Sequence, residues 1–165
     1  MIILGIDPGL ATVGYGVIDY TAAKFTTIAY GAILTPAGMP TSDRLSMIYD
    51  ELGEIIKKYH PAEMAIEELF FNTNRTTAIE VAEARGVMLL CAKKNGLRLF
   101  EYTPLQVKQS VVGYGRAEKK QVISMIKLLL NLDKAPKLDD TADALAIAVC
   151  HAHTGASGIK GYYNN

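Results

Sequence analysis

The sequence has no long apolar run, no net charge and only two cysteines, Cys91 and Cys150. No apolar stretch approaches the ~18 residues that cross a membrane. The N-terminal residues 1–7 have no basic start and reach an acidic residue too soon for a signal peptide. Two cysteines cannot form a disulfide framework. These absences predict a reduced, cytoplasmic protein.

Charge is balanced overall but uneven along the chain. Seventeen basic and seventeen acidic residues give zero net charge, which argues against a simple polybasic nucleic-acid binder. Residues 105–137 carry seven basic and two acidic side chains, whereas residues 138–150 carry three aspartates and no base. This arrangement suits a metal-dependent enzyme that acts on a polyanion. On charge alone, a solvated helix face followed by an acidic helix start is the simpler explanation.

The order of the expected elements predicts one α/β domain. No Pro/Ser-rich linker, repeat or low-complexity run divides the chain, so we expect a domain over 1–153 and a tail over 154–165. Thr41 or Ser42 would cap the first helix. The order βββαβαβααα predicts a ribonuclease H-like fold with a five-stranded mixed sheet and helices on both faces. The expected strands are 2–6, 13–20, 25–35, 64–70 and 97–102, and the expected helices are 41–59, 76–95, 104–112, 117–131 and 139–153.

Acidic residues stand at the end of one expected apolar strand and inside another, where an apolar sheet disfavours them. Asp7 follows the first strand, and Glu67 and Glu68 lie in the fourth. If a right-handed crossover places these strands side by side and parallel, Asp7 and Glu67 meet at one sheet edge. The alternatives are that Asp7 caps the following turn and that the glutamates face solvent on an edge strand.

The last expected helix carries two more candidate carboxylates. Asp140 and Asp143 are three residues apart, so they project from one helix face. Asp143 lies among small apolar residues, where an acid usually has a partner or a metal. Asp139 is explained as a helix cap.

Four gathered carboxylates would repel one another, and two divalent cations would cancel their charge. Oxygen-only ligands favour Mg²⁺ or Mn²⁺ over zinc, and paired ions of this kind support phosphodiester hydrolysis. Zinc binding at Cys150, His151 and His153 is disfavoured, because helical residues two apart point in different directions and no second ligand pair lies near.

Short motifs spread in order over residues 2–153 resemble the RuvC family of Holliday junction resolvases. The resemblance implies a homodimer that binds four-way DNA junctions and nicks them symmetrically, together with a branch-migrating motor complex of the RuvAB type. The cofactor expected from the carboxylates is two Mg²⁺ ions per site, with Mn²⁺ as a substitute. The motifs are Gly5-Ile6-Asp7-Pro8-Gly9, Gly14-Tyr15-Gly16, Ala65-Ile66-Glu67, Ala84-Arg85-Gly86, Gln106-Val107-Lys108-Gln109 with Val112-Gly113, Ala117-Glu118-Lys119, and Ala142-Asp143-Ala144-Leu145-Ala146.

Matched position by position, the resemblance also implies roles for individual residues. Lys108 and Lys119 would contact the phosphate backbone near the scissile bond. Phe70 would wedge against bases at the junction centre, with Phe71 as the alternative. Independently of the resemblance, Arg75 lies in a polar loop over 72–77 whose Asn, Thr and Arg side chains can bond phosphates or base edges, so we expect this loop to touch the junction. The catalytic and metal-binding carboxylates would be Asp7, Glu67, Asp140 and Asp143, with Glu68 a second choice to Glu67.

Three other functions remain open on the sequence. A sugar-kinase or actin-like ATPase also begins with a strand and an Asp-x-Gly turn, but it needs two domains of this kind. A ribonuclease H-like nuclease could cut RNA in a hybrid. A third possibility is a catalytically silent junction binder, but such a protein would bind DNA more tightly without four acids beside the phosphate. The apolar positions of helix 76–95 fit either a dimer interface or the core.

Overall fold

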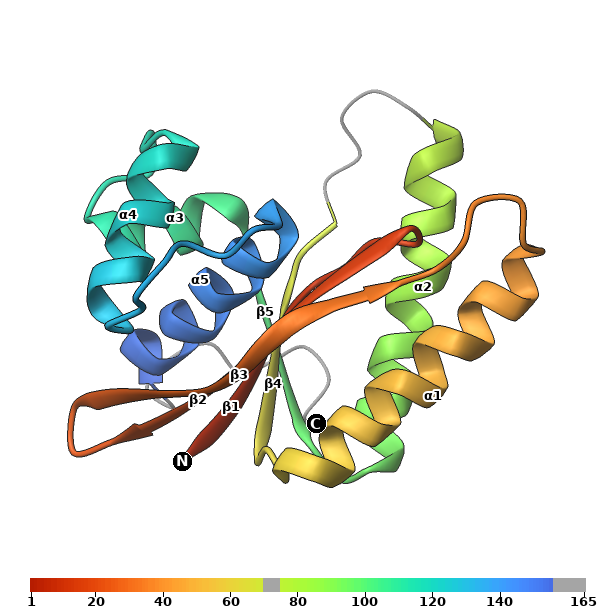
Figure 1. Cartoon of the computed structure of the whole chain (residues 1–165), viewed down its shortest axis with the longest axis horizontal. Helices are drawn as coiled ribbons and strands as arrows, with labels where there is room; N and C mark the ends of the chain where they lie inside the picture. The colour runs from red at the N-terminus through yellow and green to blue at the C-terminus, as the bar shows by residue number, and fades with distance from the viewer. Residues whose placement is uncertain (70–74, 156–165) are drawn as a thin grey trace.

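A five-stranded mixed sheet forms the centre of the structure, a computed structural model that describes residues 1–69 and 75–155 (Figure 1). The strand order is β3-β2-β1-β4-β5. β1 pairs antiparallel with β2, and β2 with β3, whereas β4 is parallel to both β1 and β5. The strands are β1 (Ile2–Asp7), β2 (Thr12–Thr21), β3 (Lys24–Leu34), β4 (Glu63–Glu67) and β5 (Arg98–Tyr102).

Helices cover both faces of the sheet, as expected from the element order (Figure 1). One face carries α1 (Thr41–Tyr59) and α2 (Arg75–Lys94), and the other carries α3 (Pro104–Val112), α4 (Lys119–Leu129) and α5 (Asp139–Thr154). Alternating residues of β1 enter the two cores, because successive strand side chains point to opposite faces. Ile3 packs with the α3–α5 cluster, whereas Leu4 and Ile6 pack with the α1–α2 cluster.

Several element boundaries differ from those expected. β4 ends at Glu67 rather than at residue 70, and the Glu68 backbone N–H donates to the Tyr102 carbonyl. α4 begins at Lys119 instead of residue 117. α5 extends to Thr154, and the expected tail lies outside the described residues from 156 onward.

Two of the expected caps are wrong. Pro40 is the N-cap of α1 and makes no side-chain cap bond, so neither Thr41 nor Ser42 caps that helix. Leu138 is the N-cap of α5, which places Asp139 in the first turn, where its charge still suits the helix N-terminus. Within the described part of the chain, no helix combines the length and apolar character that crossing a membrane requires.

Candidate active site

The ends of two parallel strands bring the first two carboxylates together. Ile6 of β1 pairs with Ile66 of β4, so Asp7 and Glu67 are the next residues on neighbouring strands. Both side chains are half-buried. The expected meeting of Asp7 and Glu67 at one sheet edge is therefore confirmed. Glu68 lies beyond the end of β4 and is exposed, which favours Glu67 as the site residue.

Close packing of α5 on the sheet brings the other two carboxylates to the same edge. Gly14 is the cross-strand partner of Asp7, and a Cβ at Gly14 would lie 2.0 Å from the backbone oxygen of Asp140. A Cβ at Gly5 would lie 2.1 Å from the backbone oxygen of Ala144. Real Cβ atoms do not approach so closely, so these glycines allow α5 to lie against β1 and β2. The first turns of α5 thereby place Asp140 and Asp143 near Asp7.

Burial and mutual repulsion perturb the carboxylates of this cluster. Burial, followed by repulsion from Glu67, Asp143 and Asp140, raises the pKa of Asp7 to about 8. Burial and the charge of Asp143 likewise raise the pKa of Glu67. Burial also raises the pKa of Asp143, although a hydrogen bond from Lys119 opposes the rise. Asp7, Glu67 and Asp143 therefore bind protons more tightly than ordinary carboxylates do.

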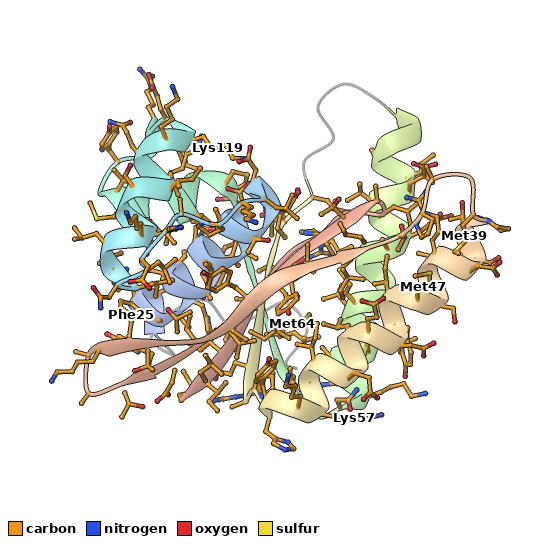
Figure 2. The ribbon with its side chains drawn as sticks, viewed as in Figure 1. Phe25, Met39, Met47, Lys57, Met64 and Lys119 are labelled. Atoms are coloured by element: carbon orange, nitrogen blue, oxygen red, sulfur yellow. The ribbon has the colours of Figure 1, made fainter. Side chains whose placement is uncertain are left out.

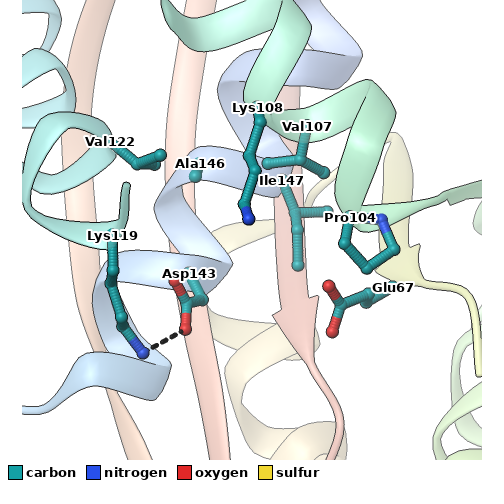
Figure 3. A pocket seen from close by; sticks show the side chains of 9 residues that line it. All are labelled: Glu67, Pro104, Val107, Lys108, Lys119, Val122, Asp143, Ala146 and Ile147. Atoms are coloured by element: carbon teal, nitrogen blue, oxygen red, sulfur yellow. Dashed lines mark hydrogen bonds and ion pairs between the residues drawn. The ribbon is translucent and has the colours of Figure 1, made fainter. Parts of the chain in front are cut away.

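Two lysines share a cavity with two of the carboxylates. Lys119 Nζ donates to Asp143 Oδ2 at 2.9 Å and pairs with Asp139 Oδ2 at 3.2 Å. Burial lowers the pKa of Lys119, but its bonds to these aspartates outweigh that effect and raise it. Lys108, Lys119, Glu67 and Asp143 line a cavity of about 200 Å³ between β4 and helices α3–α5 (Figure 3). Figure 2 shows Lys119 on the same side of the sheet as α5, away from Lys57 of α1.

The donor chemistry of the cluster fits a hard divalent cation. Its oxygens are carboxylate oxygens, which Mg²⁺ and Mn²⁺ prefer, and the repulsion at Asp7 is what a cation would relieve. As the side chains stand, no group of three Asp, Glu, His or Cys residues in the described part of the chain converges on a single ion position. Asp143 is instead paired with Lys119. The cluster thus has the carboxylate oxygens that a hard divalent cation prefers, at one end of the sheet, and Lys119 pairs with one of these carboxylates.

The remaining sequence-based assignments divide into those inside and outside the described structure. Phe70 and Phe71 lie outside the described residues. Arg75 is the first residue of α2, and its side chain lies outside the described part as well. Asp139 does not cap α5 with its side chain; it contacts Lys119. The four carboxylates and both lysines, by contrast, lie around one edge of the sheet.

Cys150 and His151 near the end of α5 are buried in the core, whereas His153 is exposed and contacts Ser110 of α3. His151 is buried, and its two ring nitrogens hydrogen bond with Tyr102 at 2.7 Å and with Glu63 at 2.5 Å. Burial lowers the pKa of His151, although Glu63 opposes this. These bonds satisfy the ring without a metal.

Sequence reasoning missed the residue that contacts the backbone of Glu67. Arg85 of α2 is buried, and its Nε donates to the Glu67 backbone oxygen at 3.2 Å. Its guanidinium also forms an ion pair with Glu101 of β5. The motif Ala84-Arg85-Gly86 pointed to this position, but an arginine in a helix gives no sequence signal for a bond to a distant strand end.

Comparison with known proteins agrees with this architecture. The family model described as "Crossover junction endodeoxyribonuclease RuvC" matches residues 3–151. The chain is 63% identical over 155 residues to the crossover junction endodeoxyribonuclease RuvC of Alkaliphilus metalliredigens strain QYMF, with 94% of each chain covered. It is also 58% identical over 154 residues to RuvC of Clostridioides difficile strain 630, with 93% of this chain and 91% of that one covered.

Solved structures agree as well. "T. thermophilus RuvC in complex with Holliday junction substrate" is similar with a TM-score of 0.89 and 35% identity, covering 93% of this chain and 94% of that one. This neighbour, like the mixed sheet with helices on both faces, confirms the expected ribonuclease H-like fold. On sequence and structure together, the chain belongs to the RuvC family of crossover junction endodeoxyribonucleases.

Proposed function

We propose that the protein is a structure-selective endodeoxyribonuclease that resolves four-way DNA junctions by paired symmetric nicks in recombination and repair. The observation that carries this proposal is the repulsive carboxylate cluster around Asp7, which lies at a cavity edge with two lysines. The similar T. thermophilus RuvC structure is in complex with a Holliday junction substrate, which supports the choice of substrate.

Asp7, Glu67, Asp140 and Asp143 are the proposed metal-binding and catalytic residues. The proposed cofactor is two Mg²⁺ ions per site, for which Mn²⁺ substitutes. Such ions, when bound, activate water and stabilise the leaving oxygen of a phosphodiester. Two side chains come from strand ends and two from α5, so the sheet and the helix fix their relative positions. Because the pKa of Asp7 is raised to about 8 and that of Glu67 is raised as well, a cation would compete with protons for these two carboxylates.

Lys108 and Lys119 are the proposed phosphate contacts. Both reach the cavity that Glu67 and Asp143 line (Figure 3). Lys119 is within hydrogen-bond distance of Asp143, so its charge lies beside the carboxylates. A DNA phosphate entering this space would meet positive charge that offsets the acids. Phe70 and Arg75 are the proposed contacts to the bases and backbone at the junction centre.

Two symmetric nicks require two active sites, and we propose a homodimer that supplies one from each subunit. The described residues of one chain contain a single carboxylate cluster of this kind. Within α2, Val87 and Leu89 pack against the core, whereas Ile79 and Leu90 are exposed and available for an interface. We also propose that the protein acts with a branch-migrating complex of the RuvAB type and is located in the cytoplasm. The chain is proposed to divide into a domain over 1–153 and a tail over 154–165.

A nicking assay on a synthetic four-way junction and a matched linear duplex tests this function. We expect Mg²⁺-dependent, symmetrically placed nicks on the junction, no nicks in EDTA and little cutting of the duplex. Equal cutting of both DNAs would contradict junction selectivity while leaving a nuclease. Bound but uncut junctions would favour a silent binder, and preferential cutting of a DNA–RNA hybrid would favour an RNA-directed nuclease.

A further inference from the structure

Arg85 is a buried cation that contacts two different strands from α2. Only 7% of the residue is exposed. Its Nε donates to the backbone oxygen of Glu67, at the end of β4. Its guanidinium also pairs with Glu101 of β5, whose side chain is only 19% exposed. One side chain therefore joins α2, β4 and β5 at a single point.

This point is where the sheet ends beside the proposed metal ligands. Ile66 is the last residue of β4 that pairs with β1, and Glu67 pairs with Tyr102 of β5 alone. The β4 backbone at Glu67 therefore lacks the two-sided pairing that holds the middle of the strand. The bond from Arg85 holds the Glu67 backbone from a third side. Because a side chain follows its backbone, this bond restricts where the Glu67 carboxylate can point.

The guanidinium group suits this role better than an ammonium would. Arginine presents several N–H donors in a planar fork and can serve two acceptors at once. Lysine offers one nitrogen at the end of a flexible stem. An Arg85→Lys variant would therefore keep the positive charge opposite Glu101 while losing the simultaneous bond to the Glu67 backbone.

We propose that Arg85, oriented by Glu101, is a positioning residue that fixes Glu67 for divalent-cation binding. The inference rests on the proposed function, in which Glu67 is a metal ligand. Arg85 contacts neither the cavity nor the other carboxylates in the described structure, so it acts through Glu67. Groups that orient metal ligands typically contribute 10–100-fold to metal affinity.

β5, the strand that carries Glu101, also provides a control. Arg98 of β5 forms an ion pair with Glu63, at the opposite end of β4 from Glu67. Arg98→Lys alters an arginine–glutamate pair that joins β5 to β4, away from the carboxylate cluster. The Arg98 side chain is 59% exposed, so its substitution should change stability little, whereas a purely structural role of Arg85 would lower the free energy of unfolding of Arg85→Lys without a selective loss of metal affinity. A positioning role would appear in metal binding for Arg85→Lys alone.

The test measures Mn²⁺ affinity by calorimetry without DNA, together with urea unfolding, junction binding in EDTA and single-turnover cleavage across Mg²⁺ concentrations. For Arg85→Lys we expect Mn²⁺ affinity to fall about 10–100-fold. The Mg²⁺ concentration for half-maximal cleavage should rise in parallel, and excess Mg²⁺ should restore part of the rate. Junction binding in EDTA should match the wild type. Glu101→Gln, which keeps an acceptor for Arg85, should show a smaller change in the same direction.

The possible outcomes separate this inference from the proposed function. The positioning role would be overturned if Arg85→Lys bound Mn²⁺ as tightly as the wild type, or if Arg98→Lys lost as much Mn²⁺ affinity as Arg85→Lys. In either case, junction cleavage by the wild type would still support the nuclease assignment. A wild-type protein that neither binds Mn²⁺ nor cuts junctions would overturn both. If Arg85→Lys does not fold, Glu101→Gln decides: unchanged metal affinity in that folded variant overturns the role.

Discussion

Replacing Asp7 with asparagine should stabilise the metal-free protein, and the gain should grow with pH. The folded-state pKa of Asp7 is about 8, against 3.8 for the unconstrained carboxyl, because the site is buried and repulsive. Between these two values the unfolded state binds fewer protons than the folded state. The stability of the wild type therefore falls as pH rises through this window, and the full penalty is reached above pH 8. Asparagine has nearly the same shape and carries no charge to bury.

The size of the gain follows from the pKa difference of about four units, from 3.8 to about 8. At 1.36 kcal/mol per unit this corresponds to about 5–6 kcal/mol as an upper value. Glu67 and Asp143 share the same repulsion, so part of it is relieved when either is protonated. Solvent screens the half-buried carboxylate as well. We therefore expect a gain of about 2 kcal/mol at pH 8 and several-fold less at pH 5.

Thermal unfolding in EDTA at pH 5 and pH 8 measures this gain. For a domain of this size, about 2 kcal/mol corresponds to a rise in Tm of roughly 4–8 °C. The exposed Asp133→Asn is the matched control and should change little at either pH. Added Mg²⁺ should raise the Tm of the wild type at pH 8 but not that of Asp7→Asn. An equal gain at both pH values, or a loss at pH 8, would refute the reasoning.

Three further variants and one control variant test the packing and the proposed DNA contacts. Gly14→Ala should lower the free energy of unfolding by about 1–3 kcal/mol, because its methyl group would collide with the Asp140 backbone oxygen. In the same urea series, Gly86→Ala has open space and should not destabilise. Junction affinity should fall steeply with salt, and Lys108→Ala should reduce the slope of log K against log salt by about 0.9; a flat wild-type response would contradict phosphate-led binding. Arg75→Ala should weaken junction binding or change cleavage preference, and no change in either would remove Arg75 from the DNA surface.

The sequence predicted which strands lie side by side and parallel, because simple rules govern their connections. A right-handed crossover places β4 beside β1, and the two strands then end together, which is enough to bring Glu67 to Asp7. Helical spacing likewise placed Asp140 and Asp143 on one face. Local hydrogen bonds were harder to foresee. Thr41 and Asp139 have good capping side chains but do not cap their helices.

Contacts between distant elements could not be predicted from residue patterns. The depth at which α5 packs depends on Gly5 and Gly14, whose importance appears only when the helix lies on the sheet. The bond from Arg85 to the Glu67 backbone joins residues 18 positions apart on different elements. The pairing of Lys119 with Asp143 likewise depends on how α4 packs near α5. These contacts between distant elements hold the carboxylates in place, and they can be seen only in the folded structure.

The most direct test of the central claim is to measure both junction cleavage in Mg²⁺ and junction binding in EDTA for Asp143→Asn. The claim is that the carboxylate cluster cleaves DNA with the help of divalent cations. We expect Asp143→Asn to lose single-turnover cleavage in Mg²⁺ while binding the four-way junction at least as tightly as the wild type, because the substitution removes a negative charge beside the phosphate. Asp7→Asn should behave in the same way. Cleavage retained in both variants would contradict the account.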